Sequence, residues 1–408
     1  MEKLVSCQLG DLIEFQRGYD LPRSEFVEGE YPVQSSNGIL GYHNEYKVIA
    51  PGITIGRSGT VGIPHLLRKN FFPHNTALFV KDFKGNDVEY IYYLLRYLDL
   101  GNRKSGSGVP TMNRNHLHPL KIKAYRDLIK QQKIANILST LDRKIALNQQ
   151  INQKLEAIAK QLYDYWFVQF DFPDENGKPY KSSGGEMVWC EVLKRDVPKG
   201  WEVSTLSTWI GNDKTGDWGK EQAEGNYQLQ VGCIRGADIN GINGDGRTSM
   251  PTRFILPKNE SKLLSPYDFV IEISGGSPTQ STGRLAGITE QVLNRFANPL
   301  ICSNFCKAIS LKDQSYFFNF MYLWKSIYDN NILFGWEGKT SGIKNLLFDA
   351  FVSKYEVVKP TKQLVEKFSE TISLIDIKKQ QSLNEIQKLT QLRDFLLPML
   401  MNGQIFVE

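Results

Sequence analysis

The side chains of this sequence that could do chemistry are hydrogen-bond donors beside glycines in polar turns. Arginine and lysine bind phosphate groups, and arginine, asparagine and glutamine can read base edges, so these turns supply the donors that contact with nucleic acid would need. Glycine beside a donor lets the backbone approach a phosphate closely. The same residues could also form ordinary solvated turns. The candidates in the first part of the chain are Arg17, Asn37, Arg57, Ser58, Thr60, Arg103, Lys104 and Ser105. The candidates in the second part are Lys214, Trp218, Arg235, Ser274, Ser277, Gln280, Arg284, Lys339 and Thr340.

The sequence lacks the motifs of two classes of enzyme that act on DNA or nucleotides. An amino-methyltransferase holds a flipped base with Asn/Asp-Pro-Pro-aromatic, and Asn298-Pro299-Leu300-Ile301 lacks both the second proline and the aromatic residue. A phosphate-binding loop has a glycine five residues before its Gly-Lys-Thr, because backbone N–H groups must wrap the phosphates. Gly338-Lys339-Thr340 has Leu333 at that position. These two absences argue against a catalytic chain.

Acidic and metal-binding residues do not form a convincing site either. Asp245 with Glu260 and Lys262 matches a nuclease spacing, but 44 acidic residues produce such a match by chance. Cys302 and Cys306 stand alone as a pair, and all five histidines lie in the first 124 residues, so a zinc site is not expected. We therefore expect no catalytic residue and no bound metal.

Composition and charge are those of an ordinary globular protein. Hydrophobic residues make up 41% and charged residues 23%, and 408 residues correspond to two or three domains. No apolar run approaches the roughly 18 residues of a membrane span, and the first residues lack the apolar core of an export signal. Five cysteines, an odd number, favour a reducing cytosol over a disulfide framework. We expect a cytoplasmic protein without a membrane partner. The net charge of +5 permits nucleic-acid binding without requiring it.

Larger elements must position these donors, and the most prominent is a long helix that occurs twice. Residues at alternating spacings of three and four form the seam of a coiled coil rather than a general amphipathic face. Each residue of the second seam lies 231 residues after its counterpart in the first, which predicts a duplicated unit. The first seam contains Ile134, Ile137, Leu141, Lys144, Asn148, Ile151, Leu155 and Ile158. The second contains Val365, Phe368, Ile372, Ile375, Lys379, Ser382, Ile386 and Leu389.

The repeat predicts an α+β fold class with pseudo-twofold symmetry. Turn residues punctuate short β-branched runs in residues 1–124 and 188–356, which we interpret as two heads of mixed α/β structure. Helical spacers follow at 125–170 and 357–403, and the polar, Gly- and Ser-rich segment 171–187 is a linker. The two helices are expected to pair as an antiparallel coiled coil. Lys144 and Asn148 would then approach Lys379 and Ser382 in a polar layer that fixes the register. The alternative is that both helices pack into the core of one domain.

Part of the first helix resembles a known family. The run QQKIANILSTLDRKI at 131–145, continued by NQKLEAIA at 152–159 and YDYWFVQFD at 163–171, resembles the first conserved helical region of specificity subunits of type I restriction-modification systems. The segments GGEMVW at 184–189 and VPKGW at 197–201 resemble the start of that family's second head. The resemblance covers the whole chain as head, helix, head and helix. The second helix departs from it by ending in RDFLLP at 393–398 instead of a Trp-Phe ending.

The resemblance implies a non-catalytic, DNA-binding specificity subunit. Each head would be a target-recognition domain that reads one half of a bipartite, asymmetric sequence in double-stranded DNA. The helices would act as a ruler and as a docking surface for two methyltransferase subunits, and two restriction and motor subunits would join that core. S-adenosylmethionine, ATP and Mg would be cofactors of the partner subunits, and none is expected in this chain. Two alternatives stay open: a self-contained DNA-modifying enzyme, and a structural coiled-coil adaptor for protein partners only.

Overall fold

The computed structural model describes residues 4–102, 112–275, 277, 279–340 and 342–406. Its internal contacts divide the chain into two compact units. Unit 1 contains Met1–Ala146 and Gln387–Glu408, and unit 2 contains Leu147–Ile386. The boundary between the units falls within each long helix, so part of each helix belongs to each unit. From the sequence, the helices were predicted as segments separate from the heads. Each unit therefore consists of one head and the helical ends that complete its core.

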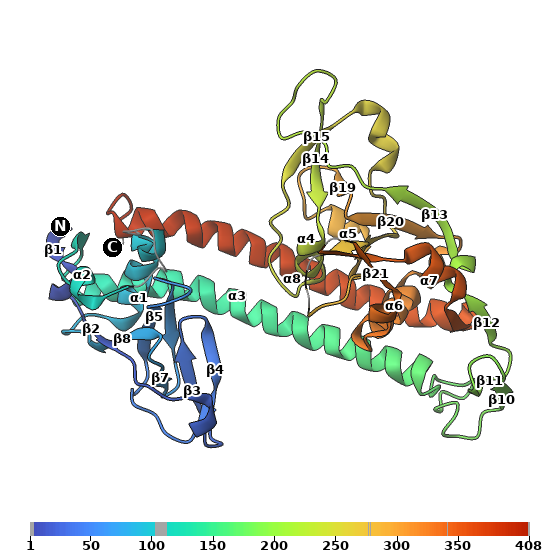
Figure 1. Ribbon diagram of the computed structural model, residues 1–408, viewed down its shortest axis with the longest axis horizontal. Helices are drawn as coiled ribbons and strands as arrows, with labels where there is room; N and C mark the ends of the chain where they lie inside the picture. The colour runs from blue at the N-terminus through green and yellow to red at the C-terminus, as the bar shows by residue number, and fades with distance from the viewer. Residues whose placement is uncertain (1–3, 103–111, 276, 278, 341, 407–408) are drawn as a thin grey trace. The chain divides into compact units, whose positions relative to one another are not determined.

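The head of unit 1 consists of small sheets and short helices (Figure 1). One sheet has the strand order β2-β8-β5-β6, a second has the order β4-β3-β7, and β1 pairs with β9. All neighbouring strands are antiparallel except β3 and β7, which are parallel. The elements are β1 (Val5–Gln8), β2 (Glu14–Arg17), β3 (Tyr31–Ser35), β4 (Gly38–His43), β5 (Gly52–Gly56), β6 (Pro64–Leu67), β7 (Phe72–Pro73), β8 (Ala77–Asp82), α1 (Val88–Leu98), α2 (Arg114–Leu117) and β9 (Lys121–Ala124).

The core of unit 1 joins the head to the ends of both long helices. Asp87 precedes helix α1, and its side chain accepts a hydrogen bond from the Tyr90 backbone N–H at 2.8 Å and so caps the helix. The apolar face of α1 packs with strands β2, β5 and β8 in one cluster of buried side chains. Ile134 and Leu138 of the first long helix and Leu400 of the second belong to the same cluster. The head therefore relies on both helices to bury its apolar surface.

The head of unit 2 is larger. Its sheets have the strand orders β13-β20-β16-β18, β15-β14-β19 and β17-β22-β21, and two further pairs are β10-β11 and β12-β23. The strands are β10 (Met187–Cys190), β11 (Arg195–Pro198), β12 (Glu202–Thr205), β13 (Ile210–Thr215), β14 (Leu229–Ile234), β15 (Thr252–Ile255), β16 (Asp268–Glu272), β17 (Ser274–Gly275), β18 (Leu285–Ile288), β19 (Leu300–Cys302), β20 (Cys306–Leu311), β21 (Glu337–Thr340), β22 (Ile343–Leu346) and β23 (Glu356–Lys359). The helices are α4 (Gly236–Asn243), α5 (Glu290–Leu293), α6 (Phe317–Asp329) and α7 (Phe348–Lys354).

The core of unit 2 is rich in aromatic side chains. Phe317, Phe320 and Trp324 of α6 pack with the β13-β20-β16-β18 sheet in one buried cluster. Trp166 and Phe368 from the helical part of the unit belong to that cluster, and their ring centroids lie 5.8 Å apart. Aromatic side chains bury large apolar areas, so this cluster fastens the head to the helices.

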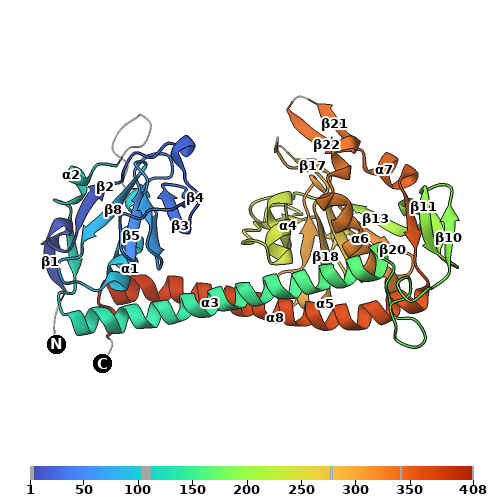
Figure 2. The ribbon, with the colours of Figure 1, turned by 90° about the horizontal axis from the view of Figure 1, so that it is seen from below.

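The two long helices are α3 (Leu128–Tyr163) and α8 (Lys362–Met401). They run antiparallel, and Figure 2 shows them side by side in each unit. In unit 1, Arg393 Nη1 donates to Asp142 Oδ1 at 2.7 Å. In unit 2, Asn148 Nδ2 donates to Glu385 Oε2 at 2.7 Å, and Asn152 Nδ2 donates to the backbone oxygen of Lys379 at 3.4 Å.

The structure corrects part of the expected seam on α3. Ile158 is 53% exposed, whereas the next residue, Ala159, is buried in the core of unit 2. In the row of seam residues formed by Ile137, Lys144, Ile151 and Ile158, the most buried position is therefore the residue that follows each of them. The reason is that α3 must bury side chains against its head as well as against α8. The buried residues that follow these seam positions are Leu138, Ile145, Asn152 and Ala159. The other seam residues are buried at Ile134 and Asn148 and half-buried at Ile137, Leu141, Ile151 and Leu155.

The seam residues of α8 are buried at Val365, Phe368, Ile372, Lys379 and Ser382 and half-buried at Ile375, Ile386 and Leu389. The polar layer differs from the expected one. Asn148 contacts Glu385 rather than Lys379, and the Lys379 ammonium contacts the carboxylate of Glu156. Lys144 is exposed. The reason is the register, which brings Lys379 opposite Asn152 and Glu156 instead of Asn148.

Candidate nucleic-acid interface

In unit 1 the structure brings the described candidate donors together in one group of loops. We call this group the first loop cluster, and its members are Arg17, Asn37, Arg57, Ser58 and Thr60 with Asn75 and Thr76. Asn37, at the tip of the β3-β4 hairpin, accepts a hydrogen bond from the Thr60 backbone N–H at 3.3 Å. The Arg57 backbone N–H donates to the backbone oxygen of Thr76 at 2.8 Å. Residues far apart in the sequence therefore form one polar surface.

Arg17 reaches the same cluster from the end of β2. Its guanidinium pairs with Asp20 at 3.0 Å and stays half exposed. Asn75 Nδ2 also donates to Asp20, and Arg57 Nη1 donates to the backbone oxygen of Asn75 at 3.5 Å. Asn75 thus links the two arginines. Asn75 and Thr76 were not among the residues predicted from the sequence, although their polar run directly after the short strand β7 could have indicated them.

Glycine is required where the β5-β6 loop folds back. A Cβ atom on Gly56 would lie 1.7 Å from the Thr60 backbone oxygen, closer than any real contact. Gly62 has φ +79°, in the left-handed region that favours glycine, and packs against the backbone of Gly101. These two glycines therefore restrict the backbone conformation of the loop that carries Arg57, Ser58 and Thr60. Arg103, Lys104 and Ser105 lie outside the described residues.

In unit 2 three candidates line one open cleft of about 470 Å³. We call the residues around this cleft the second loop cluster. Trp218 lies in the loop after β13, Arg235 precedes α4, and Ser274 begins β17. Asn304 and Phe305, in the turn between β19 and β20, also line the cleft and were not indicated by the sequence. The aromatic residue Phe305 in that short turn could have indicated these two residues from the sequence.

The polar side chains of the second loop cluster are fixed by internal contacts. Arg235 Nε donates to Asp238 Oδ2 at 2.8 Å, and its Nη2 donates to the Ser249 hydroxyl at 2.9 Å. Ser274 Oγ donates to Asn345 Oδ1 at 2.5 Å. The Arg253 guanidinium lies 4.0 Å from the centre of the Trp218 ring, in a cation–π contact.

Lys214 and Arg284 are not the exposed loop donors that the sequence suggested. Lys214 lies in β13, and its Nζ contacts Asp268 Oδ2 at 2.8 Å and the Leu263 backbone oxygen at 2.9 Å. Arg284 forms a bidentate ion pair with Glu272, in which Nε donates to Oε2 at 2.8 Å and Nη2 donates to Oε1 at 2.6 Å. These hydrogen bonds raise the pKa of the guanidinium. Both side chains are mostly shielded and bind buried carboxylates, so they stabilise the fold.

The remaining candidates of unit 2 lie between β17 and β18 and in β21. Ser277 Oγ accepts a hydrogen bond from the Gln280 backbone N–H at 3.2 Å, and Gln280 is exposed. Lys339 and Thr340 belong to β21, where they pair with Lys344 and Ile343 of β22.

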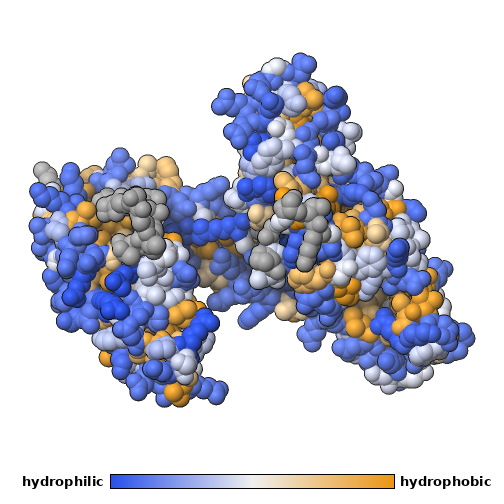
Figure 3. Space-filling model, in the orientation of Figure 1, coloured by the Kyte–Doolittle hydropathy of each residue, from blue (hydrophilic) through white to orange (hydrophobic). Residues whose placement is uncertain are grey.

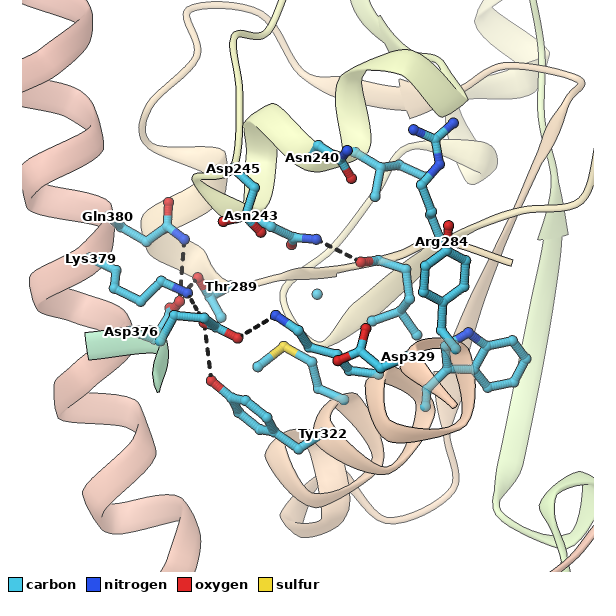
Figure 4. A pocket seen from close by; sticks show the side chains of 18 residues that line it. Asn240, Asn243, Asp245, Arg284, Thr289, Tyr322, Asp329, Asp376, Lys379 and Gln380 are labelled. Carbon is cyan, nitrogen blue, oxygen red and sulfur yellow. Dashed lines mark hydrogen bonds and ion pairs between the residues drawn. The ribbon is translucent and has the colours of Figure 1, made fainter. Parts of the chain in front are cut away.

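A second cavity, of about 140 Å³, lies in unit 2 between the head and both long helices (Figure 4). Glu156 of α3 accepts hydrogen bonds from Lys325 of α6, at 2.5 Å, and from Lys379 of α8. Burial alone would raise the pKa of Glu156, but Lys379 and Lys325 together lower it to about 2. Nearby on α8, burial raises the pKa of Asp376, which accepts hydrogen bonds from Thr289 and Gln380. This network connects the head of unit 2 to both long helices.

Two features are absent from the described part of the chain. No group of three or more His, Cys, Asp or Glu side chains there could hold a metal ion. No helix within the described ranges is long and apolar enough to cross a membrane. The face of the protein in Figure 3 is mostly hydrophilic, with apolar patches between the polar side chains.

Comparisons with known proteins agree with the family suggested by the helical sequence. Residues 1–157 match the family model described as the type I restriction modification DNA specificity domain. The chain is 25% identical over 329 residues to the type I restriction enzyme MjaIX specificity subunit of Methanocaldococcus jannaschii, covering 78% of this chain and 69% of that protein. It is 26% identical over 323 residues to the HindI specificity subunit of Haemophilus influenzae, covering 67% of each.

A solved structure supports the same fold. The S subunit of a type I restriction-modification system from M. genitalium matches with a TM-score of 0.62 at 18% identity, covering 98% of this chain and 96% of that one. The resemblance indicated by the helical sequence is thus confirmed, and this chain has the fold and the sequence relatives of the specificity subunits of type I restriction-modification systems.

Proposed function

We propose that this protein is a non-catalytic, DNA-binding specificity subunit of a type I restriction-modification system. In this proposal each loop cluster contacts one half of a bipartite, asymmetric target in double-stranded DNA. The paired helices α3 and α8 set the spacing between the two half-sites. The loop clusters differ in sequence and structure, so the two half-sites are expected to differ as well.

The observation that carries the proposal is the first loop cluster. Five candidate residues from β2, the β3-β4 hairpin and the β5-β6 loop converge there, around Asn75 and Thr76. Arginine and asparagine side chains side by side can combine phosphate contacts with base-edge hydrogen bonds, which is what sequence recognition requires. The match of residues 1–157 to a DNA specificity domain supports this assignment.

The proposed partners are two methyltransferase subunits and two restriction and motor subunits. The long helices and the residues just after α3 expose large apolar side chains, among them Leu147, Tyr165, Leu374 and Phe395. A protein partner bound to the helices would remove such apolar side chains from water. S-adenosylmethionine, ATP and Mg²⁺ would be bound by these partners.

The direct test is to co-express the full chain with its methyltransferase subunit and to sequence the methylated sites. We expect two short specified segments separated by an unspecified gap, and mass photometry of the complex should give two methyltransferase subunits per chain. A single uninterrupted recognition sequence would contradict the bipartite assignment. A stable one-to-one complex at saturating partner would contradict the stoichiometry.

Variants can assign the first loop cluster to one half-site. Arg57→Ala should relax base preference within one segment only and leave the other segment unchanged. Arg68→Ala is the matched control, because Arg68 lies beyond the opposite end of β6 and pairs with Glu89 at 2.6 Å. If Arg57→Ala left both segments unchanged, the loop cluster would not be a reading surface.

A further inference from the structure

The cleft of the second loop cluster is lined by large apolar side chains that solvent can reach. Trp218 is 36% exposed, Ile343 44% and Phe305 54%, although they come from three separate loops and strands. Isolated exposed apolar residues are common, but several that line one cleft usually mark a binding site. The cleft therefore offers apolar side chains to a bound ligand.

The side chains of Arg235, Glu272 and Ser274, which line the same cleft, already have partners. Both carboxylate oxygens of Glu272 accept hydrogen bonds from Arg284. The Arg235 guanidinium is bound to Asp238 and Ser249, and the Ser274 hydroxyl is bound to Asn345. A phosphate or another charged group would have to break these contacts in order to bind. The cleft consequently favours an apolar group over an ionic one.

The apolar side chains are held in place by the backbone around them. The Phe305 backbone oxygen accepts hydrogen bonds from the N–H groups of Ile273 and Ser274, at 2.9 and 3.2 Å. A Cβ atom on Gly216 would lie 2.0 Å from the Ser303 backbone oxygen, so the loop that leads to Trp218 packs tightly against the turn that carries Phe305. A rigid apolar surface loses little entropy when it binds.

We infer that this cleft recognises the C5-methyl group of a thymine in one half of the DNA target. The inference rests on the proposed function, because it assumes that the second loop cluster faces duplex DNA. The major groove offers polar base edges and one apolar group, the thymine methyl, which apolar side chains contact. Asn304, exposed at the rim of the cleft, is placed to hydrogen-bond to a neighbouring base edge.

The test uses the full chain in complex with its methyltransferase subunits and DNA carrying the recognition sequence found by methylation-site sequencing. Each thymine of the site is replaced in turn by deoxyuracil, which removes only the methyl group. Burying one methyl group corresponds to roughly a fourfold change in affinity, so one replacement should weaken binding by about that factor. With the Phe305→Ala complex the same replacement should weaken binding less than twofold, since the contact is already lost.

Trp189→Ala provides the matched control. Trp189 is 53% exposed in the β10-β11 hairpin and does not line the cleft. Its complex should keep the full uracil effect. A variant complex that still binds non-specific DNA with the original salt dependence has kept its fold, so loss of the uracil effect would then report on the contact itself.

Three results would overturn the inference. They are a target without thymine in either strand, a uracil scan without effect on wild-type binding, and an unchanged uracil effect with Phe305→Ala. Each of them leaves the proposed function intact as long as the complex binds one sequence specifically. If the wild-type complex retained no specific sequence, the proposed function itself would fail, and the inference with it.

Discussion

Replacing Glu156 by glutamine should weaken the attachment of the unit 2 head to the long helices. The Glu156 carboxylate is the shared partner of Lys325 and Lys379, and the Lys379 side chain is only 9% exposed. Glu156→Gln keeps the shape but removes the charge, which leaves Lys379 buried beside a neutral amide. Removing one partner of a buried ion pair typically costs roughly 3–5 kcal/mol.

The pKa of Glu156 leads to a similar magnitude. It falls from the ordinary 4.5 to about 2, a difference between the unfolded and the folded state that corresponds to roughly 3 kcal/mol. Lys325 remains partly exposed, so we expect the lower end of the range, about 3 kcal/mol at neutral pH.

The effect should depend on pH in a defined direction. Between about pH 4.5 and pH 2 the unfolded chain binds a proton at Glu156 and the folded chain does not. The stability supplied by this carboxylate is therefore complete above pH 4.5 and is lost as the pH falls towards 2. The difference between wild type and Glu156→Gln should shrink over the same range. Other carboxyl groups titrate there too, but they are common to both proteins.

Urea unfolding followed by tryptophan fluorescence is suited to this measurement, because all seven tryptophans lie in unit 2. Glu224→Gln is the control, since Glu224 forms an exposed pair with Lys220 and its loss should leave the unfolding midpoint unchanged. A Glu156→Gln protein within 1 kcal/mol of wild type at neutral pH, or with the wild-type pH dependence, would refute the reasoning.

Three further predictions concern DNA binding and the helices. Lys214→Met should lower the stability of unit 2 by roughly 2–3 kcal/mol, because it leaves Asp268 buried without its counter-ion, and should not change the salt dependence of DNA binding. A reduced salt dependence at unchanged stability would instead make Lys214 a phosphate contact. Replacing Arg103 and Lys104 together by alanine should lower the slope of log affinity against log salt by about 1.8 without changing base preference. Lost preference at an unchanged slope would make them base readers. Deleting residues 143–149 and 385–391, one heptad from each helix, should shorten the spacer by about 10 Å and the preferred gap by roughly three base pairs, or abolish binding. Methylation of the original sites by this variant would show that the helices are not the ruler.

Much of the architecture follows from the sequence because it depends on local periodicity. The repeated spacing of three and four residues and the fixed offset of 231 residues locate both long helices, observed at Leu128–Tyr163 and Lys362–Met401. The family resemblance likewise depends on a contiguous helical run. Loop donors such as Arg57 and Thr60 could be selected as candidates because glycines and polar residues mark turns wherever they occur.

The tertiary structure decided which of these side chains remain available to a ligand and which become internal. Lys214 and Arg284 resemble the other candidates in sequence, but both face buried carboxylates, Asp268 and Glu272, that are distant along the chain or on another strand. The seam of α3 moved by one residue at Ala159 for a related reason, since the helix packs against a head as well as against α8. Pairings of this kind depend on contacts between residues far apart in the sequence. Periodicity and residue type describe only what each segment can do, whereas the fold determines which partner each side chain meets.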